Sequence, residues 1–267
     1  MLGNFYSLRG AHDRAVLYFR RALRLSPSYL AAWTLMGHEY VELRNTPAAI
    51  ECYRRAVDAN ARDYRAWYGL GQTYEILAMY LYACHYYRKA AALRPHDARM
   101  WIALGAAYEQ LQRTRDACAC YARARALRDR DSLATLRLAK LHVARGAPER
   151  AAQYYAAYVS EREAAAGGGG EGGEGAPAAA VAGPEVAEAL LFLARAALAA
   201  GRDAAAEVYA GRVLTMPLLH EVQEARGLLN DVRARQRRAG AERAEEELFA
   251  PAEAEEEDDM MVDLGDE

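Results

Sequence analysis

The sequence predicts an all-α solenoid in which pairs of helices repeat along the chain. A tyrosine, a glycine and an alanine return every 34 residues through the first half. The series are Tyr6, Tyr40, Tyr74, Tyr108; Gly3, Gly37, Gly71, Gly105; and Ala15, Ala49, Ala83, Ala117, Ala151. Several residue types that keep one phase indicate a repeated structural unit rather than a biased composition.

The repeating positions have packing reasons. Small residues let two antiparallel helices approach closely, and large residues interlock neighbouring hairpins. One hairpin cannot bury its apolar face alone, so stacking supplies the core. This spacing is the tetratricopeptide repeat (TPR) pattern, and we expect a TPR superhelix. The predicted repeat-packing residues are Gly3, Tyr6, Trp33, Gly37, Tyr40, Trp67, Gly71, Tyr74, Trp101, Gly105 and Tyr108.

The pattern divides the chain into four parts. Residues 1–162 form a TPR array of about five repeats, and residues 163–184 form a flexible linker of Gly, Ala and Pro. Residues 185–240 hold a further TPR-like repeat and a capping helix. Residues 241–267 are expected to be a disordered acidic tail. Met1 falls inside a first helix, so the first repeat is truncated, and Leu2, Phe5 and Val16 should be exposed.

Helix starts are marked by short polar side chains. Asp63, Asp97 and Asp131 each come just before a first helix, where a carboxylate accepts hydrogen bonds from free backbone amides. Thr46 and Pro47 predict an N-cap followed by the first helical residue.

Composition indicates a soluble intracellular protein. The chain has 267 residues, 53% of them hydrophobic, and no apolar run approaches the roughly 20 residues of a membrane span. No secretory signal is visible at the start. The tail holds 13 acidic residues and one basic residue, which leaves 24 acidic and 33 basic residues in the rest of the chain. We expect this tail to be solvated, although it could also lie on the basic body.

The sequence predicts neither catalysis nor a cofactor nor a metal. Gly167, Gly169 and Gly172 satisfy a GxGxxG string, but no strand precedes them. Cys118 and Cys120 point to different faces of a helix, so they cannot share a metal ion well. Nucleic-acid binding is not expected, because the large aromatic residues are already used for packing. Basic residues of the second helices, such as Arg20 and Arg54, are interpreted as solvated charge.

First helices line the concave groove of a TPR superhelix. The predicted partner-binding residues are Asn4, Ser7, His38, Glu42, Arg65, Tyr68, Gln72, Glu75, Arg99 and Glu109. The three glutamates suit an extended segment carrying arginine, since carboxylates form charge-assisted hydrogen bonds to a guanidinium. The alternative is that they only pair with Arg65 and Arg99 or face water.

Residues between the repeat positions carry a more specific resemblance. Residues 4–10, 15–23, 32–40 and 62–75 closely resemble the subunit 8 family of the anaphase-promoting complex, and the likeness extends over about residues 2–160. The resemblance implies a non-catalytic scaffold in a multisubunit ubiquitin ligase that controls mitotic progression, in nucleus and cytoplasm. It implies sibling subunits and an arginine-containing activator segment as partners, without nucleic acid or membrane.

Two points of the resemblance stay open. The family forms a homodimer through further N-terminal repeats, which this sequence lacks, so homodimerisation is doubtful for this chain. A truncated gene model is the expected reason. The alternatives in function are a free-standing TPR peptide-binding adaptor or cochaperone and the regulatory array of an enzyme. The carboxylate clamp of common chaperone-tail receptors is missing, and no catalytic domain is attached.

Overall fold

The computed structural model describes residues 1–27, 29, 31–129, 131–167 and 183–249, and every regular element in these ranges is an α-helix. The first five hairpins pair α1 (Leu2–Leu8) with α2 (His12–Leu25), α3 (Ala31–Glu42) with α4 (Thr46–Ala59), α5 (Tyr64–Ile76) with α6 (Tyr80–Leu93), α7 (Ala98–Gln110) with α8 (Thr114–Ala126), and α9 (Leu133–Ala144) with α10 (Pro148–Gly167). The last helices are α12 (Pro184–Ala199), α13 (Asp203–Leu214) and α14 (Leu219–Phe249). The predicted all-α TPR fold is confirmed.

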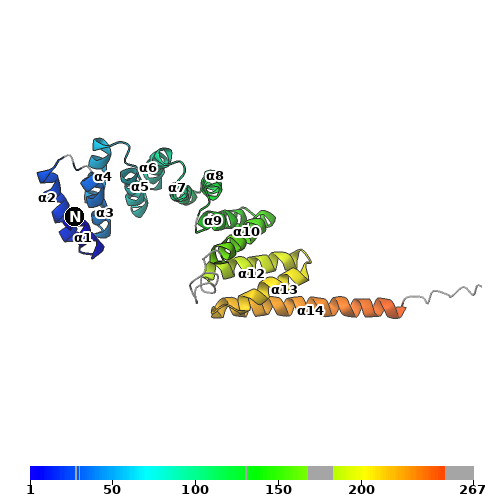
Figure 1. The fold of residues 1–267 in the computed structure, drawn as a ribbon. Helices are drawn as coiled ribbons and strands as arrows, with labels where there is room; N and C mark the ends of the chain where they lie inside the picture. Colours follow the sequence, from blue (N-terminus) through cyan, green and yellow to red (C-terminus); the bar gives the residue numbers. More distant parts are fainter. Residues whose placement is uncertain (28, 30, 130, 168–182, 250–267) are drawn as a thin grey trace, which may run out of the picture. The chain divides into compact units, whose positions relative to one another are not determined.

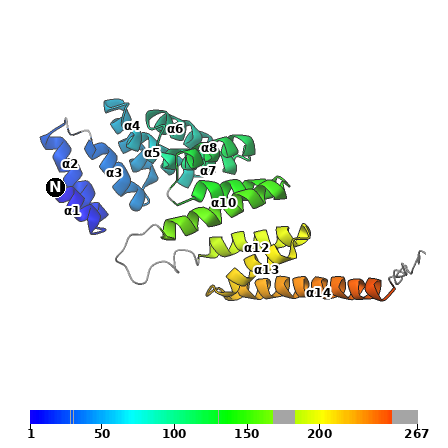
Figure 2. The same cartoon turned by 45° about the vertical axis from the view of Figure 1, so that its right-hand side comes forward.

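The chain divides into two compact units, Met1–Leu193 and Ala194–Glu267. In the first unit, each helix from α1 to α10 contacts the next one along the chain, and the hairpins lie side by side in sequence order (Figures 1 and 2). In the second unit, α13 packs against α14, and Ala197, Ala206 and Val232 form a small buried cluster.

The turns inside the hairpins repeat as regularly as the helices. Gly10, Arg44, Ala78, Gln112 and Gly146 all have a positive φ, between 55° and 71°. Each ends the first helix of its hairpin in the left-handed region, where the chain reverses toward the second helix. Only glycine adopts this conformation without steric cost. The three non-glycine residues therefore carry backbone strain in an otherwise regular turn.

Two helix starts differ from the prediction. Asp63 and Asp97 cap α5 and α7 as predicted, each accepting a bond from the backbone amide two residues on at 3.1 Å. Asp131 does not cap α9, which begins two residues later, and Asp129 instead accepts a bond from Ala134 N at 3.0 Å. The cap of α4 is also one residue earlier than predicted.

In that cap, Asn45 Oδ1 accepts a bond from Ala48 N at 3.2 Å, and Thr46 is already helical. An asparagine side chain accepts this hydrogen bond at least as well as a threonine hydroxyl, so Asn45 and not Thr46 is the N-cap of α4.

Two helices extend past the expected part boundaries. α10 runs to Gly167, beyond the boundary at 162, because residues 161–166 are mainly Glu and Ala, which favour helix. α14 runs to Phe249, beyond the expected start of the tail at 241, for the same reason. The central part of the predicted linker and residues 250–267 of the predicted acidic tail lie outside the described residues.

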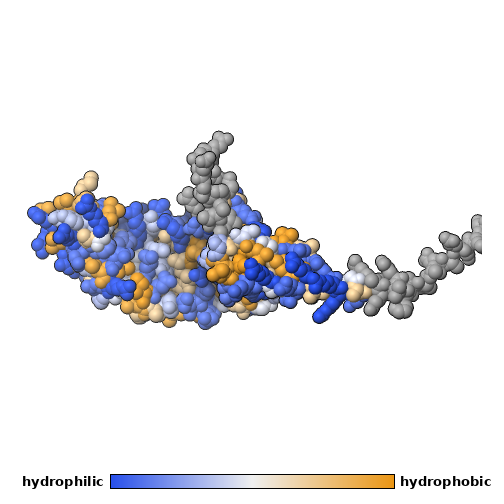
Figure 3. All heavy atoms as spheres, turned by 90° about the horizontal axis from the view of Figure 1, so that it is seen from below, coloured by the Kyte–Doolittle hydropathy of each residue, from blue (hydrophilic) through white to orange (hydrophobic). Residues whose placement is uncertain are grey.

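Apolar side chains at the start of the array are partly exposed. Leu2 and Phe5 are exposed, as predicted, but Val16 is buried at 7% because it faces the core between α2 and its neighbours. Apolar residues also gather in patches on the face drawn in Figure 3. None of the described helices combines the length and the apolar character that a membrane span needs.

Candidate functional site

A pocket of about 220 Å³ lies between the first helices of two successive hairpins. His38, Val41 and Glu42 line it from α3, and Gln72, Glu75 and Ile76 line it from α5. Tyr53 of α4 closes its inner side. The pocket brings together His38, Glu42, Gln72 and Glu75, which the repeat phase had assigned to one groove. It combines two carboxylates with two aliphatic side chains.

Three buried tyrosines of the second helices contact predicted groove residues of the first helices from the core side. Tyr87 donates a hydrogen bond to Glu75 Oε2 at 2.5 Å, and Tyr121 donates one to Glu109 Oε2 at 2.9 Å. The Tyr53 hydroxyl lies 2.9 Å from His38 Nδ1. All three rings are at most 1% exposed. Burial, followed by interactions with the glutamate, raises the pKa of Tyr87 and of Tyr121, so both hydroxyls stay protonated.

The charges of the groove are mostly uncompensated. Glu42 and Glu75 form no ion pair within the described part of the chain, whereas Glu109 lies 3.8 Å from Arg137. Burial lowers the pKa of His38, which favours its neutral form. The pocket between α3 and α5 therefore offers two carboxylates, and its described lining residues include no lysine or arginine.

Arg65 and Arg99, the alternative partners considered for these glutamates, contact other groups. Arg99 binds Asp97 through two hydrogen bonds, at 2.9 and 3.1 Å, and Arg65 lies over the Tyr64 ring at 5.8 Å. Neither forms an ion pair with a groove glutamate among the described residues. Tyr68 is half-buried, and its ring lies 5.4 Å from that of Tyr87. Asn4 is exposed and Ser7 is half-buried, both on α1.

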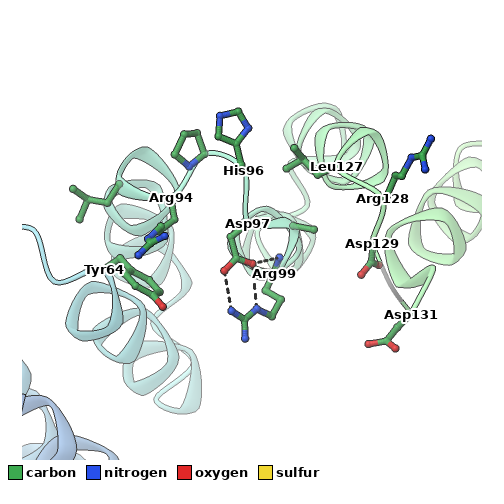
Figure 4. A pocket seen from close by; sticks show the side chains of 12 residues that line it. Tyr64, Arg94, His96, Asp97, Arg99, Leu127, Arg128, Asp129 and Asp131 are labelled. Carbon is green, nitrogen blue, oxygen red and sulfur yellow. Dashed lines mark hydrogen bonds and ion pairs between the residues drawn. The ribbon is translucent and has the colours of Figure 1, made fainter.

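A larger pocket of about 820 Å³ lies at the loops that join hairpins, between Tyr64, Arg94, Asp97 and Asp131 (Figure 4). Its charges are partly compensated within the pocket. Arg94 lies over the Tyr64 ring at 4.7 Å, and Asp97 holds Arg99, which keeps the pKa of that carboxyl below its usual range. Because positive and negative side chains lie close together in this pocket, the pocket favours neither an anionic nor a cationic ligand.

The packing positions explain why the repeats are so regular. A Cβ atom on Gly3, Gly37, Gly71 or Gly105 would meet the ring of Phe19, Tyr53, Tyr87 or Tyr121, respectively, at 2.8 Å or less. Tyr40 and Tyr74 are buried, and their hydroxyls accept hydrogen bonds from Arg20 at 2.7 Å and Arg54 at 2.9 Å.

Both arginines are exposed, as expected for solvated charge, and in addition each donates a hydrogen bond to a buried tyrosine of the next hairpin. The remaining packing residues, Tyr6, Trp33, Trp67, Trp101 and Tyr108, are half-buried against the core.

Two of the buried cysteines lie in surroundings that disfavour the reactive thiolate form. Burial raises the pKa of Cys52 and of Cys120 to about 11, which disfavours the thiolate that nucleophilic attack or metal binding needs. Cys118 is half-buried and Cys120 is buried, as expected for neighbouring positions of one helix. Within the described ranges, no group of three or more His, Cys, Asp or Glu residues is placed to hold a metal ion.

The sequence interpretation missed the tyrosine hydroxyls. The large aromatic residues were expected to serve packing alone, whereas the hydroxyls of Tyr53, Tyr87 and Tyr121 contact groove residues. One signal was available: the matching position in the first repeat is Phe19, which has the same ring without the hydroxyl.

Comparison with known protein families agrees with the repeated helical hairpins. Tetratricopeptide repeat families match residues 1–29, 34–77, 64–97 and 98–128. These hairpins are tetratricopeptide repeats. Similar solved structures include pilF of Pseudomonas aeruginosa, with a TM-score of 0.59, 23% identity and coverage of 85% of this chain and 94% of that one. MamA has a TM-score of 0.57 and 19% identity over 61% of this chain and 95% of its own. Both likenesses concern the fold.

Part of the chain resembles subunit 8 of the anaphase-promoting complex. The Arabidopsis thaliana protein of that name is 69% identical over 48 residues, and the Dictyostelium discoideum protein is 57% identical over 49 residues. Anaphase-promoting complex subunit CDC23 of Saccharomyces cerevisiae is 56% identical over 52 residues. The matches cover 18–20% of this chain and 8% of each relative.

Proposed function

We propose that the chain is a non-catalytic TPR scaffold subunit of the anaphase-promoting complex, a multisubunit ubiquitin ligase. The observation that carries this proposal is the 69% identity over 48 residues to the Arabidopsis thaliana subunit 8. Such identity within a repeat array is informative because the repeat skeleton alone fixes only a few positions per repeat. The fold supports the role, since stacked hairpins present long surfaces to several partners.

The groove adds a second part to the proposal. It binds an extended segment of an activator protein that carries arginine. Glu42 and Glu75 supply carboxylates that no cation among the described residues neutralises. Val41 and Ile76 supply aliphatic surface for the stem of an arginine side chain. A guanidinium forms charge-assisted hydrogen bonds with carboxylates, which fixes the register of the bound segment.

Affinity purification of the tagged chain from native extract, followed by mass spectrometry, tests the assignment to the complex. We expect cullin-like and RING-type ligase subunits to be recovered together with sibling TPR subunits. Recovery of chaperones alone would overturn the scaffold role and favour a free-standing adaptor.

Fluorescence anisotropy tests the groove. The probe is a fluorescein-labelled short peptide with one central arginine flanked by leucine residues, which match Val41 and Ile76. Charge reversal of the two pocket carboxylates, Glu42→Arg with Glu75→Arg, should abolish binding. Glu51→Arg serves as the control, because Glu51 is exposed on α4 and does not line the pocket. If the double variant binds the arginine peptide as tightly as the wild type does, the groove proposal is wrong.

A further inference from the structure

We infer that Tyr87 and Tyr121 are positioning residues, whose hydroxyls hold the Glu75 and Glu109 carboxylates in the orientation that selects a guanidinium over an ammonium group. This inference rests on the proposed function of the groove. It adds a specificity device that acts from behind the binding surface. Neither tyrosine needs to touch the bound segment.

The hydroxyl is not required by the packing of the ring. In the first hairpin, Phe19 lies against Gly3 in the same way that Tyr87 lies against Gly71, with ring atoms 2.6 Å and 2.5 Å from where a Cβ would be. Phe19 is 4% exposed, so a ring without a hydroxyl fills this core position fully. The hydroxyl of Tyr87 therefore has a use other than packing.

That use is visible in what the hydroxyls contact. Tyr87 and Tyr121 both bind the Oε2 atom of a glutamate twelve residues earlier, on the first helix of the same hairpin. The same arrangement thus occurs in two successive repeats. One oxygen of each carboxylate is fixed toward the core. In Glu75 this leaves Oε1 and the second lone pair of Oε2 for a ligand in the groove, whereas Glu109 Oε1 already lies 3.8 Å from Arg137.

A fixed carboxylate discriminates between cations. A guanidinium presents a rigid planar fork and gains two parallel hydrogen bonds only if the carboxylate plane is correctly set. An ammonium is a compact point charge, and its attraction depends little on that plane. Holding the plane therefore raises affinity for arginine far more than for lysine.

The test compares the arginine peptide defined above with the same peptide carrying lysine. We expect Tyr87→Phe with Tyr121→Phe to weaken binding of the arginine peptide by roughly tenfold or more and to leave lysine-peptide binding nearly unchanged. The matched control is Tyr155→Phe. Tyr155 occupies the same place in α10 and packs against Phe192 at 4.8 Å, but it forms no hydrogen bond within the described residues. The ratio of arginine-peptide to lysine-peptide affinity of the Tyr155→Phe variant should equal that of the wild type.

The outcomes separate this inference from the groove proposal. If the wild type does not bind the arginine peptide, the groove proposal fails and this inference fails with it. If Glu75→Gln abolishes binding while the double tyrosine variant, folded by circular dichroism, keeps the wild-type ratio of arginine to lysine affinity, only this inference is overturned. A loss of thermal stability with an unchanged ratio leads to the same conclusion, because a purely structural role would not change selectivity.

Discussion

Tyr53 occupies the space beside Gly37 that any side chain there would need: a Cβ on Gly37 would lie 2.4 Å from Tyr53 Cε1. Tyr53 is fully buried, so its ring cannot move toward solvent to make room. Gly37→Ala should therefore lower the free energy of unfolding by about 1–3 kcal/mol, as overpacking of a core does.

Gly227→Ala is the matched control for this substitution. Gly227 lies in α14 with nothing within 4 Å of a would-be Cβ, so alanine there should stabilise the helix by up to about 1 kcal/mol. Chemical denaturation of both variants gives the comparison. Equal effects of the same sign would contradict the role assigned to Tyr53.

Ala78 has a φ of 56°, in the region that glycine occupies in the equivalent turns at Gly10 and Gly146. Ala78→Gly should raise the free energy of unfolding by about 0.5–1 kcal/mol, because the left-handed conformation costs an alanine more than a glycine. The reverse change, Gly146→Ala, should lower it. Thermal unfolding measures both, and a destabilised Ala78→Gly variant would show that this turn is not strained.

Arg54 Nη2 on α4 donates a hydrogen bond at 2.9 Å to the hydroxyl of Tyr74 on α5, and the bond thus joins two neighbouring hairpins. A double-mutant cycle of Arg54→Ala and Tyr74→Phe should give a coupling energy of about 0.5–1.5 kcal/mol. The phenylalanine keeps the ring that stacks on Tyr82 and Tyr86, so the cycle isolates the hydrogen bond. Arg20 and Tyr40 form the equivalent pair and should couple with the same sign. Additive single effects would mean that the bond contributes nothing to stability.

His38 makes stability depend on pH. Burial lowers its pKa in the folded state from 6.5, so the unfolded chain takes up a proton first as the pH falls. The contribution of neutral His38 to the free energy of unfolding is therefore fully present above pH 6.5. It is lost as the pH falls below that value toward the lower pKa of the folded state. His38→Gln does not titrate and should lose less stability between neutral and mildly acidic pH. His142, whose pKa burial also lowers, keeps a residual slope in both proteins. Identical slopes in urea denaturation would exclude this contribution of His38.

The repeat phase predicted much of the fold, because it reports which residues face each other at close approach. Gly37 and Gly71 lie against rings, as their small size required, and Asp63 and Asp97 cap their helices. The predicted caps at Thr46 and Asp131 were wrong, because the nearby polar side chains of Asn45 and Asp129 bind the helix amides instead. A periodic pattern does not say which of two adjacent side chains reaches a given amide.

The groove was predicted in part for the same reason. His38, Glu42, Gln72 and Glu75 converge because helical phase places them on facing helices. The hydrogen bonds from Tyr87 and Tyr121 were not predicted, since they depend on how deep a ring lies and on where its hydroxyl emerges. Repeat position encodes the face of a helix, but it does not encode the reach of a side chain through the core.

Tyr53 is also enclosed from a second direction, because a Cβ on Gly69 would lie 2.4 Å from its Cζ atom. The ring thus lies between α3 and α5, in two successive repeats. The positions one repeat before and after Gly69 hold Leu35 and Ala103, so this arrangement is particular to one joint. In a stack whose cooperativity depends on nearest-neighbour interfaces, such a joint makes the two repeats open together. Amide exchange in α3, α4 and α5 should then report a single opening free energy.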